Sequence, residues 1–183
     1  SHPQVVAAAV AELIEHLSGA PAARALLRAE VGRPRKPFGD TLVVVTGAGS
    51  GIGRETAKAF AADGAEVVVC DIDGAAAEDA AAQVCGAGGT AHPYVLDVAD
   101  AEAVERFAEQ VCAQHGVPDI VVNNAGIGLA GSFLDTPAEQ FDRVLDVNLG
   151  GVVNGCRAFA RRLVDRGTGG HMSTSRRWRP TRR

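Results

Sequence analysis

The segment that most constrains the fold of this chain is the glycine-rich stretch at residues 46–53, TGAGSGIG. It follows an apolar run at 42–45 that is typical of a buried strand. It also opens an amphipathic helix in which Ile52, Thr56 and Phe60 share one face. Glycines permit a tight turn and let backbone N–H groups approach a pyrophosphate at the positive end of the helix. The pattern predicts a dinucleotide-binding βαβ unit; a merely structural βα turn is the alternative.

An acidic residue stands where such a unit needs one. Asp71 closes the next apolar run, 66–71, and lies 18 positions after Gly53. A carboxylate at this point accepts hydrogen bonds from ribose hydroxyls. The glycine motif thus has its strand, helix, second strand and acid in the expected order, which favours nucleotide binding over a bare turn.

From Thr41 onward, strand and helix patterns alternate. Alternation of this kind predicts an α/β fold, a Rossmann-type doubly wound parallel sheet with helices on both faces. Right-handed crossovers give the strand order 3-2-1-4, with the ligand crevice at the carboxyl ends of strands 1 and 4. The sheet is expected to be incomplete, with about four strands. The predicted strands are 41–45, 66–71, 91–96 and 118–122, and the predicted helices are 51–63, 74–85, 100–115, 137–147 and 150–166.

Polar residues follow the third and fourth predicted strands. Asp97 could accept from an adenine amino group while Val98 packs against the ring; the alternative is a helix cap, a role that Asp100 fits better. After strand 4, the run 123–126, NNAG, lets backbone pass close to a ribose, although Asn and Gly also form plain turns. Asn148 lies in a long helical stretch that asparagine disfavours, which predicts a break there that could hold a water, or a cap for the next helix.

Composition limits the broad class of protein. The chain has 183 residues, 46% of them hydrophobic, and a formal net charge of −4, which suits an ordinary α/β domain and argues against nucleic acid as a partner. No apolar run is long enough to span a bilayer. The four cysteines lack metal-like spacing, so we expect no metal site, and buried free thiols in a reducing cytoplasm. They are Cys70, Cys85, Cys112 and Cys156.

These motifs, in this order, resemble the short-chain dehydrogenase/reductase family over roughly residues 40–170. The resemblance implies NAD(P)-dependent hydride transfer involving a small alcohol or ketone, and a homo-oligomer. It makes Asn148 the first member of a catalytic Asn-Ser-Tyr-Lys set. Asp71, with no arginine after it, favours NAD over NADP, whose extra phosphate it would repel. The implied cofactor contacts are Gly47, Ser50, Gly51, Ile52, Gly53, Asp71, Ile72, Asp97, Val98, Asn124, Ala125 and Gly126.

The sequence departs from the family after Asn148. No Tyr-x-x-x-Lys is present: Tyr94 is the one tyrosine, and the lysines are Lys36 and Lys58. Because tyrosine and lysine carry the proton transfer, we expect this chain to lack catalysis. It would then be an oxidoreductase by descent, or a non-catalytic nucleotide-binding or interaction module.

Residues 171–183 form an Arg-rich tail whose composition predicts no buried strand. Regrouping the codons from Met172 by one base can encode Val-Asn-Val-Ser-Ser-Met-Ala-Ala-Tyr-Ala, a suitable fifth strand and serine. We therefore predict an out-of-frame tail after His171, with a genuine basic tail as the alternative. The fold should then stop after strand 4 and leave an open edge that self-associates.

The first 40 residues lie outside the dehydrogenase pattern. Residues 1–30 resemble the last helix of an α/β-hydrolase, as in bacterial fusions of an epoxide-hydrolase-like domain with a short-chain dehydrogenase. Residues 31–40 are a basic, Pro-rich linker. The predicted domain is therefore 41–170.

Overall fold

A computed structural model of the protein describes residues 37–129 and 131–175. The predicted helix within 1–30 and most of the linker lie outside these residues, as do residues 176–183. Within the described residues, a parallel sheet has the order β3-β2-β1-β4-β5. Its strands are β1 (Leu42–Thr46), β2 (Glu66–Asp71), β3 (Thr90–Val95), β4 (Ile120–Asn123) and β5 (His171–Thr174).

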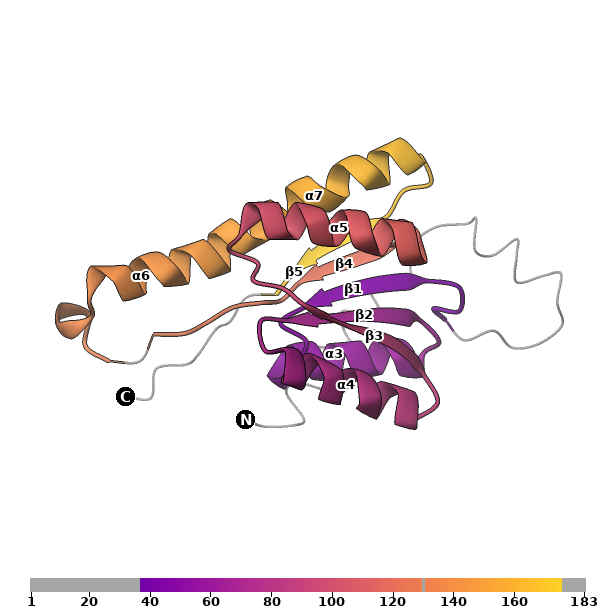
Figure 1. Cartoon of the computed structure of the whole chain (residues 1–183), viewed down its shortest axis with the longest axis horizontal. Helices are drawn as coiled ribbons and strands as arrows, with labels where there is room; N and C mark the ends of the chain where they lie inside the picture. Colours follow the sequence, from indigo (N-terminus) through magenta and orange to yellow (C-terminus); the bar gives the residue numbers. More distant parts are fainter. Residues whose placement is uncertain (1–36, 130, 176–183) are drawn as a thin grey trace, which may run out of the picture.

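Helices cover both faces of the sheet, as the alternating pattern predicted (Figure 1). Two of them, α3 (Gly51–Ala62) and α4 (Gly74–Gly86), pack on one face, and α5 (Ala101–His115) and α7 (Gly151–Arg166) lie on the other. The observed bounds of these elements are within two residues of the predicted ones. Hydrophobic periodicity therefore located the elements correctly because both faces of the sheet are buried.

The core has two halves, separated by the sheet. Val43 and Val45 belong to the half beneath α3 and α4, whereas Val44 belongs to the half beneath α5 and α7. This division follows from the two-residue period of a strand. Phe60 fills the first half and Phe159 the second, each at most 1% exposed.

The predicted end of the sheet at strand 4 is wrong. Residues 171–174 form β5, which runs parallel to β4 with Val121 opposite Met172 and Asn123 opposite Thr174. Pairing of parallel strands uses backbone groups, so a polar segment can complete a ladder when the chain delivers it there. Met172 also packs against the core half that contains Phe107. Residues 171–174 do not form a buried strand, as expected, but they do form a half-buried one, which needs little apolar sequence.

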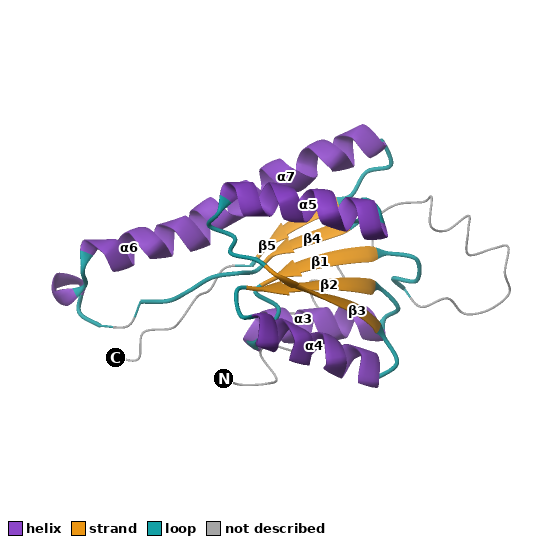
Figure 2. Ribbon diagram, viewed as in Figure 1, coloured by secondary structure: helices purple, strands orange, loops and turns teal. Residues whose placement is uncertain are grey.

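A long helical segment leaves the carboxyl end of the sheet (Figure 2). It comprises α6 (Ala138–Leu145), a π-helical turn at Asp146–Gly150, and α7. The predicted break at Asn148 is thus confirmed as a π turn, a feature often found at functional sites. In the part of the chain that the structure describes, none of the helices combines the length and apolarity needed to cross a membrane.

All four cysteines are free thiols, as predicted, but only Cys70 is buried. Cys85 is exposed because it lies on the outer side of α4, and the other two are half-buried. Burial raises the pKa of the Cys70 thiol, and the adjacent Asp71 carboxylate adds to this effect. Apolar neighbours in the sequence therefore did not predict burial of the three helical cysteines, because a surface helix also has a face toward solvent.

Candidate functional site

The glycine-rich turn connects β1 to α3 with little space to spare. A Cβ at Gly53 would lie 2.2 Å from the Gly47 carbonyl oxygen and 2.4 Å from the Asn124 amide nitrogen. Such separations are far below contact distance, so only glycine fits at this point. Gly51 differs: it has φ +56° and a Cβ there would meet nothing within 4 Å. The tight side of the turn faces the protein, and the open side faces solvent.

The open side presents the N-terminus of α3. Ser50 occupies the N-cap position, but its side chain makes no capping hydrogen bond. The N–H groups of a first helical turn have no partner within the helix, and the helix dipole makes this end positive. Ser50, Gly51 and Ile52 are all exposed here. The geometry fits a bound anion such as a pyrophosphate.

Asp71 lies against the same turn, at the end of β2. Its Oδ2 accepts a hydrogen bond of 2.9 Å from the backbone N–H of Gly49. Its Oδ1 accepts one of 3.1 Å from the N–H of Asp73. The next residue, Ile72, is 60% exposed. The carboxylate is thus oriented beside the positive end of α3, as the spacing from Gly53 predicted.

A latch between β1 and β4 brings the Asn-Ala-Gly segment to the turn. Thr46 Oγ1 accepts hydrogen bonds from the N–H groups of Asn124, at 3.0 Å, and Ala125, at 2.9 Å. In return, Asn124 Nδ2 donates to the carbonyl of Thr46 at 2.9 Å. Sequence reasoning did not select Thr46 as a site residue. A hydroxyl at the end of a buried strand was the available signal, because a buried hydroxyl needs a partner.

Ser175 adds a second unexpected contact. It follows β5 directly, and its hydroxyl donates to Asn124 Oδ1 at 2.9 Å. The sequence reading assigned Ser175 to an out-of-frame tail and expected nothing of it. The contact arises because β5 pairs with β4, which carries the end of one strand to the end of the other.

Asp97 is placed differently from the expectation. As predicted, Asp100 caps α5, accepting from the N–H of Ala103 at 3.0 Å. Asp97 is not left free by this. Its Oδ1 accepts from the N–H of Ala99 at 3.0 Å and its Oδ2 from Arg143 at 2.8 Å. Partial burial raises the pKa of Asp97, but these hydrogen bonds and the Arg143 charge outweigh it and hold the pKa below its ordinary value.

Val98 belongs to the core rather than to an open surface. It is 7% exposed and packs in the half-core beneath α5 and α7. The expected contact of this side chain with an adenine ring is therefore limited to the little surface that remains. Val98 is therefore apolar because it packs in the core.

Asn148 connects the π turn to the segment after β4. Its Oδ1 accepts from the N–H of Ile127 at 2.9 Å, and its Nδ2 donates to the carbonyl of the same residue at 2.9 Å. A Cβ on Gly126 would lie 3.3 Å from Asn148 Oδ1. The amide thus holds the chain just past Gly126, rather than capping α7, whose N-cap is Gly150.

Most predicted site residues therefore gather at one end of the sheet. The glycine turn, Asp71, the Asn124–Gly126 segment and Asn148 all lie at the carboxyl ends of the strands, around the switch point between β1 and β4. Tyr94 does not join them, because its hydroxyl contacts Gln114 and His115 near the end of α5.

Comparison with known proteins agrees with this geometry. Residues 41–174 match the family model of the short chain dehydrogenase. Probable oxidoreductase EphD of Mycobacterium tuberculosis is 73% identical over 172 residues, which cover 94% of this chain and 29% of that protein. This alignment is longer than the family match, so the similarity extends outside residues 41–174.

Solved structures give the same picture. A short-chain type dehydrogenase/reductase from Mycobacterium marinum superposes with a TM-score of 0.72 at 37% identity, covering 75% of this chain and 54% of that one. A metagenomic short-chain oxidoreductase in complex with NADP is 32% identical, with a TM-score of 0.71, over 75% of this chain and 62% of that one. One from Burkholderia phymatum in complex with NAD is 30% identical, with a TM-score of 0.72, over 75% of this chain and 49% of that one.

The chain thus spans less than a third of EphD and about half to two thirds of these solved structures. Its glycine turn, acidic strand end and π-turn asparagine form one site on a five-stranded parallel sheet. From this site and the family match, we conclude that the chain belongs to the short-chain dehydrogenase family, whose members are NAD(P)-dependent oxidoreductases of small molecules.

Proposed function

We propose that this chain binds NAD(H) in preference to NADP(H), in a dehydrogenase that acts on an alcohol or ketone. The observation that carries the proposal is the Asp71 carboxylate, held 2.9 Å from the Gly49 N–H beside the open end of α3. Relatives of the same fold bind NADP in one case and NAD in another, so the fold by itself does not choose. The choice depends on local charge.

The charges around Asp71 favour a ribose without a phosphate. A carboxylate accepts hydrogen bonds from the two ribose hydroxyls, whereas a 2′-phosphate would meet like charge. Arg54 is the cation on the glycine turn, and its guanidinium is already engaged. Its Nε donates to the Gly49 carbonyl at 2.8 Å, and its side chain pairs with Asp79 at 3.4 Å. Arg54 is therefore committed to the turn rather than to a phosphate.

Calorimetric titration of the chain with both cofactors tests this choice. We expect tighter binding of NAD(H). Asp71→Asn should reduce the difference, because it removes the charge but keeps the shape of the side chain. Each charge-assisted hydrogen bond lost would cost about 1.5–3 kcal/mol. Glu78→Gln, an exposed change on α4, is the control that should alter neither affinity. Tighter binding of NADP(H) by the unaltered chain contradicts the proposal.

We propose further that the 183-residue chain binds the cofactor without turning over a substrate. The nicotinamide, when bound, supplies or accepts the hydride; the protein must move the proton. Ser175 and Asn148 lie at the carboxyl ends of the strands, but within residues 37–129 and 131–175 no tyrosine or lysine lies beside them. The hydroxyl of Tyr94 is held by Gln114 at 2.5 Å, and Lys58 pairs with Glu55 on α3. General acid–base catalysis contributes about 10²–10⁴-fold, so its loss should leave no measurable turnover.

Incubation of the purified chain with NAD and a panel of alcohols tests for turnover. We expect no NADH. Restoring the alternative reading frame after His171, together with downstream sequence, should restore activity. NADH formation by the 183-residue chain would show that catalysis does not need the missing tyrosine and lysine. We therefore propose that this chain acts as a nucleotide-binding module. Dehydrogenase activity would need the residues restored by the alternative reading frame.

We propose that the chain self-associates through its long helical segment, and not through an open edge of β4 as the sequence predicted. β5 covers the edge of β4, which leaves the long helical segment as the apolar surface. Leu145, Leu149 and Val153 recur every four residues along it and are 46%, 62% and 44% exposed. An exposed apolar stripe of this kind marks interaction sites. Sedimentation at several concentrations should show an oligomer that Leu149→Glu dissociates and that Val95→Glu, at an exposed position of β3, does not.

A further inference from the structure

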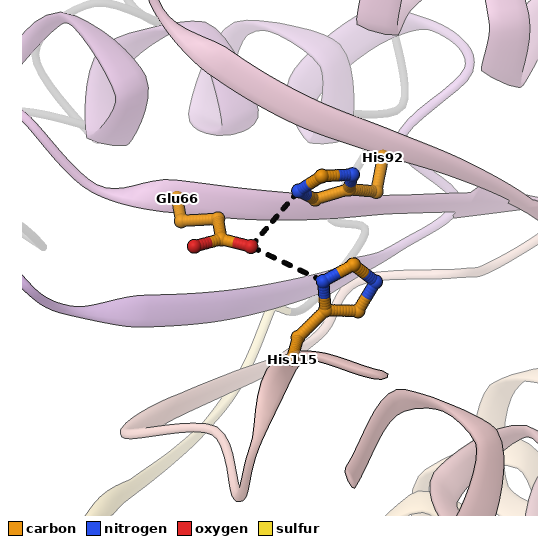
Figure 3. Close-up of side chains that lie close together, drawn as sticks. All are labelled: Glu66, His92 and His115. Carbon is orange, nitrogen blue, oxygen red and sulfur yellow. Dashed lines mark hydrogen bonds and ion pairs between the residues drawn. The ribbon is translucent and has the colours of Figure 1, made fainter. Parts of the chain in front are cut away.

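Three potential metal ligands converge on one point beside β2 and β3 (Figure 3). Glu66 begins β2, His92 lies in β3, and His115 ends α5. Asp71 is five residues after Glu66 along the same strand. At about 3.3 Å per residue, the two carboxylates are therefore roughly 16 Å apart. The cluster belongs to the opposite end of the sheet and takes no part in the proposed cofactor binding.

The three side chains converge on one point. Glu66 Oε1 lies 2.9 Å from His92 Nε2 and 3.2 Å from His115 Nδ1. The three ligand atoms all lie within 4.8 Å of one another. In a tetrahedral zinc site with bonds of about 2.0–2.2 Å, neighbouring ligand atoms are roughly 3.3–3.6 Å apart. The two separations that involve Glu66 are 0.1 Å or more below this range, so the carboxylate needs to move back only slightly to admit an ion.

The hydrogen bonds around His115 call for a cation between it and Glu66. Tyr94 has a single hydroxyl hydrogen, which it donates to Gln114 Oε1 at 2.5 Å. His115 Nε2, 2.9 Å from the same hydroxyl, must therefore donate its own hydrogen to it. A neutral imidazole with hydrogen on Nε2 has a lone pair on Nδ1, and this lone pair points at the Glu66 carboxylate. Two acceptors cannot bond each other without a proton or a metal ion between them.

A metal ion satisfies every one of these groups. With the ion on Nδ1, the Nε2–H of His115 donates to Tyr94, and Tyr94 donates to Gln114. Metal-bound histidines commonly have such a partner on the second nitrogen, which fixes the tautomer and the ring orientation. His92 offers a second imidazole, and its ring lies 4.1 Å from that of His115, centroid to centroid. Two imidazoles and one carboxylate suit a borderline cation such as Zn²⁺.

We propose that Glu66, His92 and His115 bind one zinc ion, with Tyr94 as a positioning residue for His115. Three protein ligands leave the fourth position of the tetrahedron for water. A hollow of about 440 Å³, lined in part by Glu66, Thr90, His115 and Asp119, adjoins the ligands and gives water access. The ion would connect β2, β3 and the end of α5. Its expected role is to stabilise this end of the sheet.

Titration of the full 183-residue chain with Zn²⁺, after removal of metal by a chelator, tests the proposal. We expect one saturable site by calorimetry and a higher thermal midpoint with zinc. Titration with Co²⁺ should give the intense visible absorption of tetrahedral coordination, a result that depends on no variant. His92→Asn and Glu66→Gln should abolish the site. Tyr94→Phe should weaken zinc affinity by about 10–100-fold and keep the tetrahedral spectrum.

The control is His171→Asn, which removes a histidine of β5 outside the cluster and should leave zinc binding unchanged. The three ligands are partly exposed, so their replacement should leave the far-ultraviolet circular dichroism unaltered. Zinc binding that persists in both ligand variants would overturn the proposal. Failure of the unaltered chain to bind zinc or cobalt would overturn it too, and a proton would then occupy the position between His115 and Glu66.

Discussion

Asn148 and Ile127 form two hydrogen bonds of 2.9 Å: the Ile127 N–H donates to Asn148 Oδ1, and Asn148 Nδ2 donates to the Ile127 carbonyl. The π turn at Asp146–Gly150 places the amide opposite the segment that leaves β4. Two groups 21 residues apart in the sequence are thereby held in one geometry beside Gly126. The asparagine that the family pattern assigns to catalysis has, in this structure, a positioning contact with the chain.

This contact predicts the effect of Asn148→Leu. The leucine keeps the size of the side chain but loses both hydrogen bonds, so the Ile127 N–H should exchange with deuterium faster than in the unaltered chain. The free energy of unfolding should fall by about 1–2 kcal/mol, because the bonds are exposed. Hydrogen exchange measured by mass spectrometry checks the first result and urea unfolding the second. Asp142→Leu on α6 is the control, and unchanged exchange at Ile127 in Asn148→Leu would contradict this role of the two hydrogen bonds.

The latch at Thr46 predicts that Thr46→Val destabilises the fold more than Asn148→Leu does. Thr46→Val should destabilise the fold by about 2–4 kcal/mol, because the N–H groups of Asn124 and Ala125 lose their acceptor. It should also weaken NAD binding, since the Asn124–Gly126 segment would be released from the turn. Thr46→Ser keeps the hydroxyl and should retain most of both properties. Urea unfolding and calorimetry measure the two effects, and equal behaviour of the valine and serine variants would disprove this role of the hydroxyl.

Gly53 should tolerate no side chain. Gly53→Ala would bring a Cβ to 2.2 Å from the Gly47 carbonyl oxygen, so backbone must move. We expect a loss of about 3 kcal/mol in the free energy of unfolding, at the upper end of the usual cost of overpacking. Gly86→Ala, at the end of α4 where a Cβ meets nothing within 4 Å, should instead stabilise the chain by up to about 1 kcal/mol. A soluble Gly53→Ala variant of ordinary stability would refute the close approach of the turn to α3.

The pair of Asp97 and Arg143 predicts a pH dependence. The pKa of Asp97 is lower in the folded chain than its ordinary value of 3.8. Its stabilising contribution is therefore complete above pH 3.8 and is lost as the pH falls through the lower, folded value. Both side chains are more than a third exposed, at 35% and 43%, so the contribution should be below about 1 kcal/mol.

Arg143→Met should remove most of this dependence. Unfolding curves recorded from neutral to acid pH measure it, with Arg161→Met, which alters an exposed arginine of α7, as the control. We expect the two variants to differ near neutral pH and to converge in acid. A difference that grows as the pH falls would contradict the sign of the pKa shift.

Strand β5 is the element that hydrophobic periodicity did not predict. Residues 171–174 have no apolar run, and the reading therefore ended the sheet at β4. Strand formation there depends on Gly167 and Gly169, whose positive φ angles turn the chain after α7, and on the ladder of β4, which pairs with the returning segment. Neither cause is visible in four residues of sequence. The nature of residues 172–183 as out-of-frame sequence stays a prediction, which the coding DNA would test.

The sequence by itself determined the parts of this protein that depend on local pattern. Two- and 3.6-residue periods located the strands and helices, and the spacing of the glycines and Asp71 indicated a turn and a carboxylate that lie together at the end of α3, because these features depend on neighbours along the chain. Only the tertiary structure decided which distant groups meet: Thr46 with Asn124, Asn148 with Ile127, and Glu66 with two histidines. These contacts join residues 21 to 78 positions apart, and sheet pairing and helix packing bring them together.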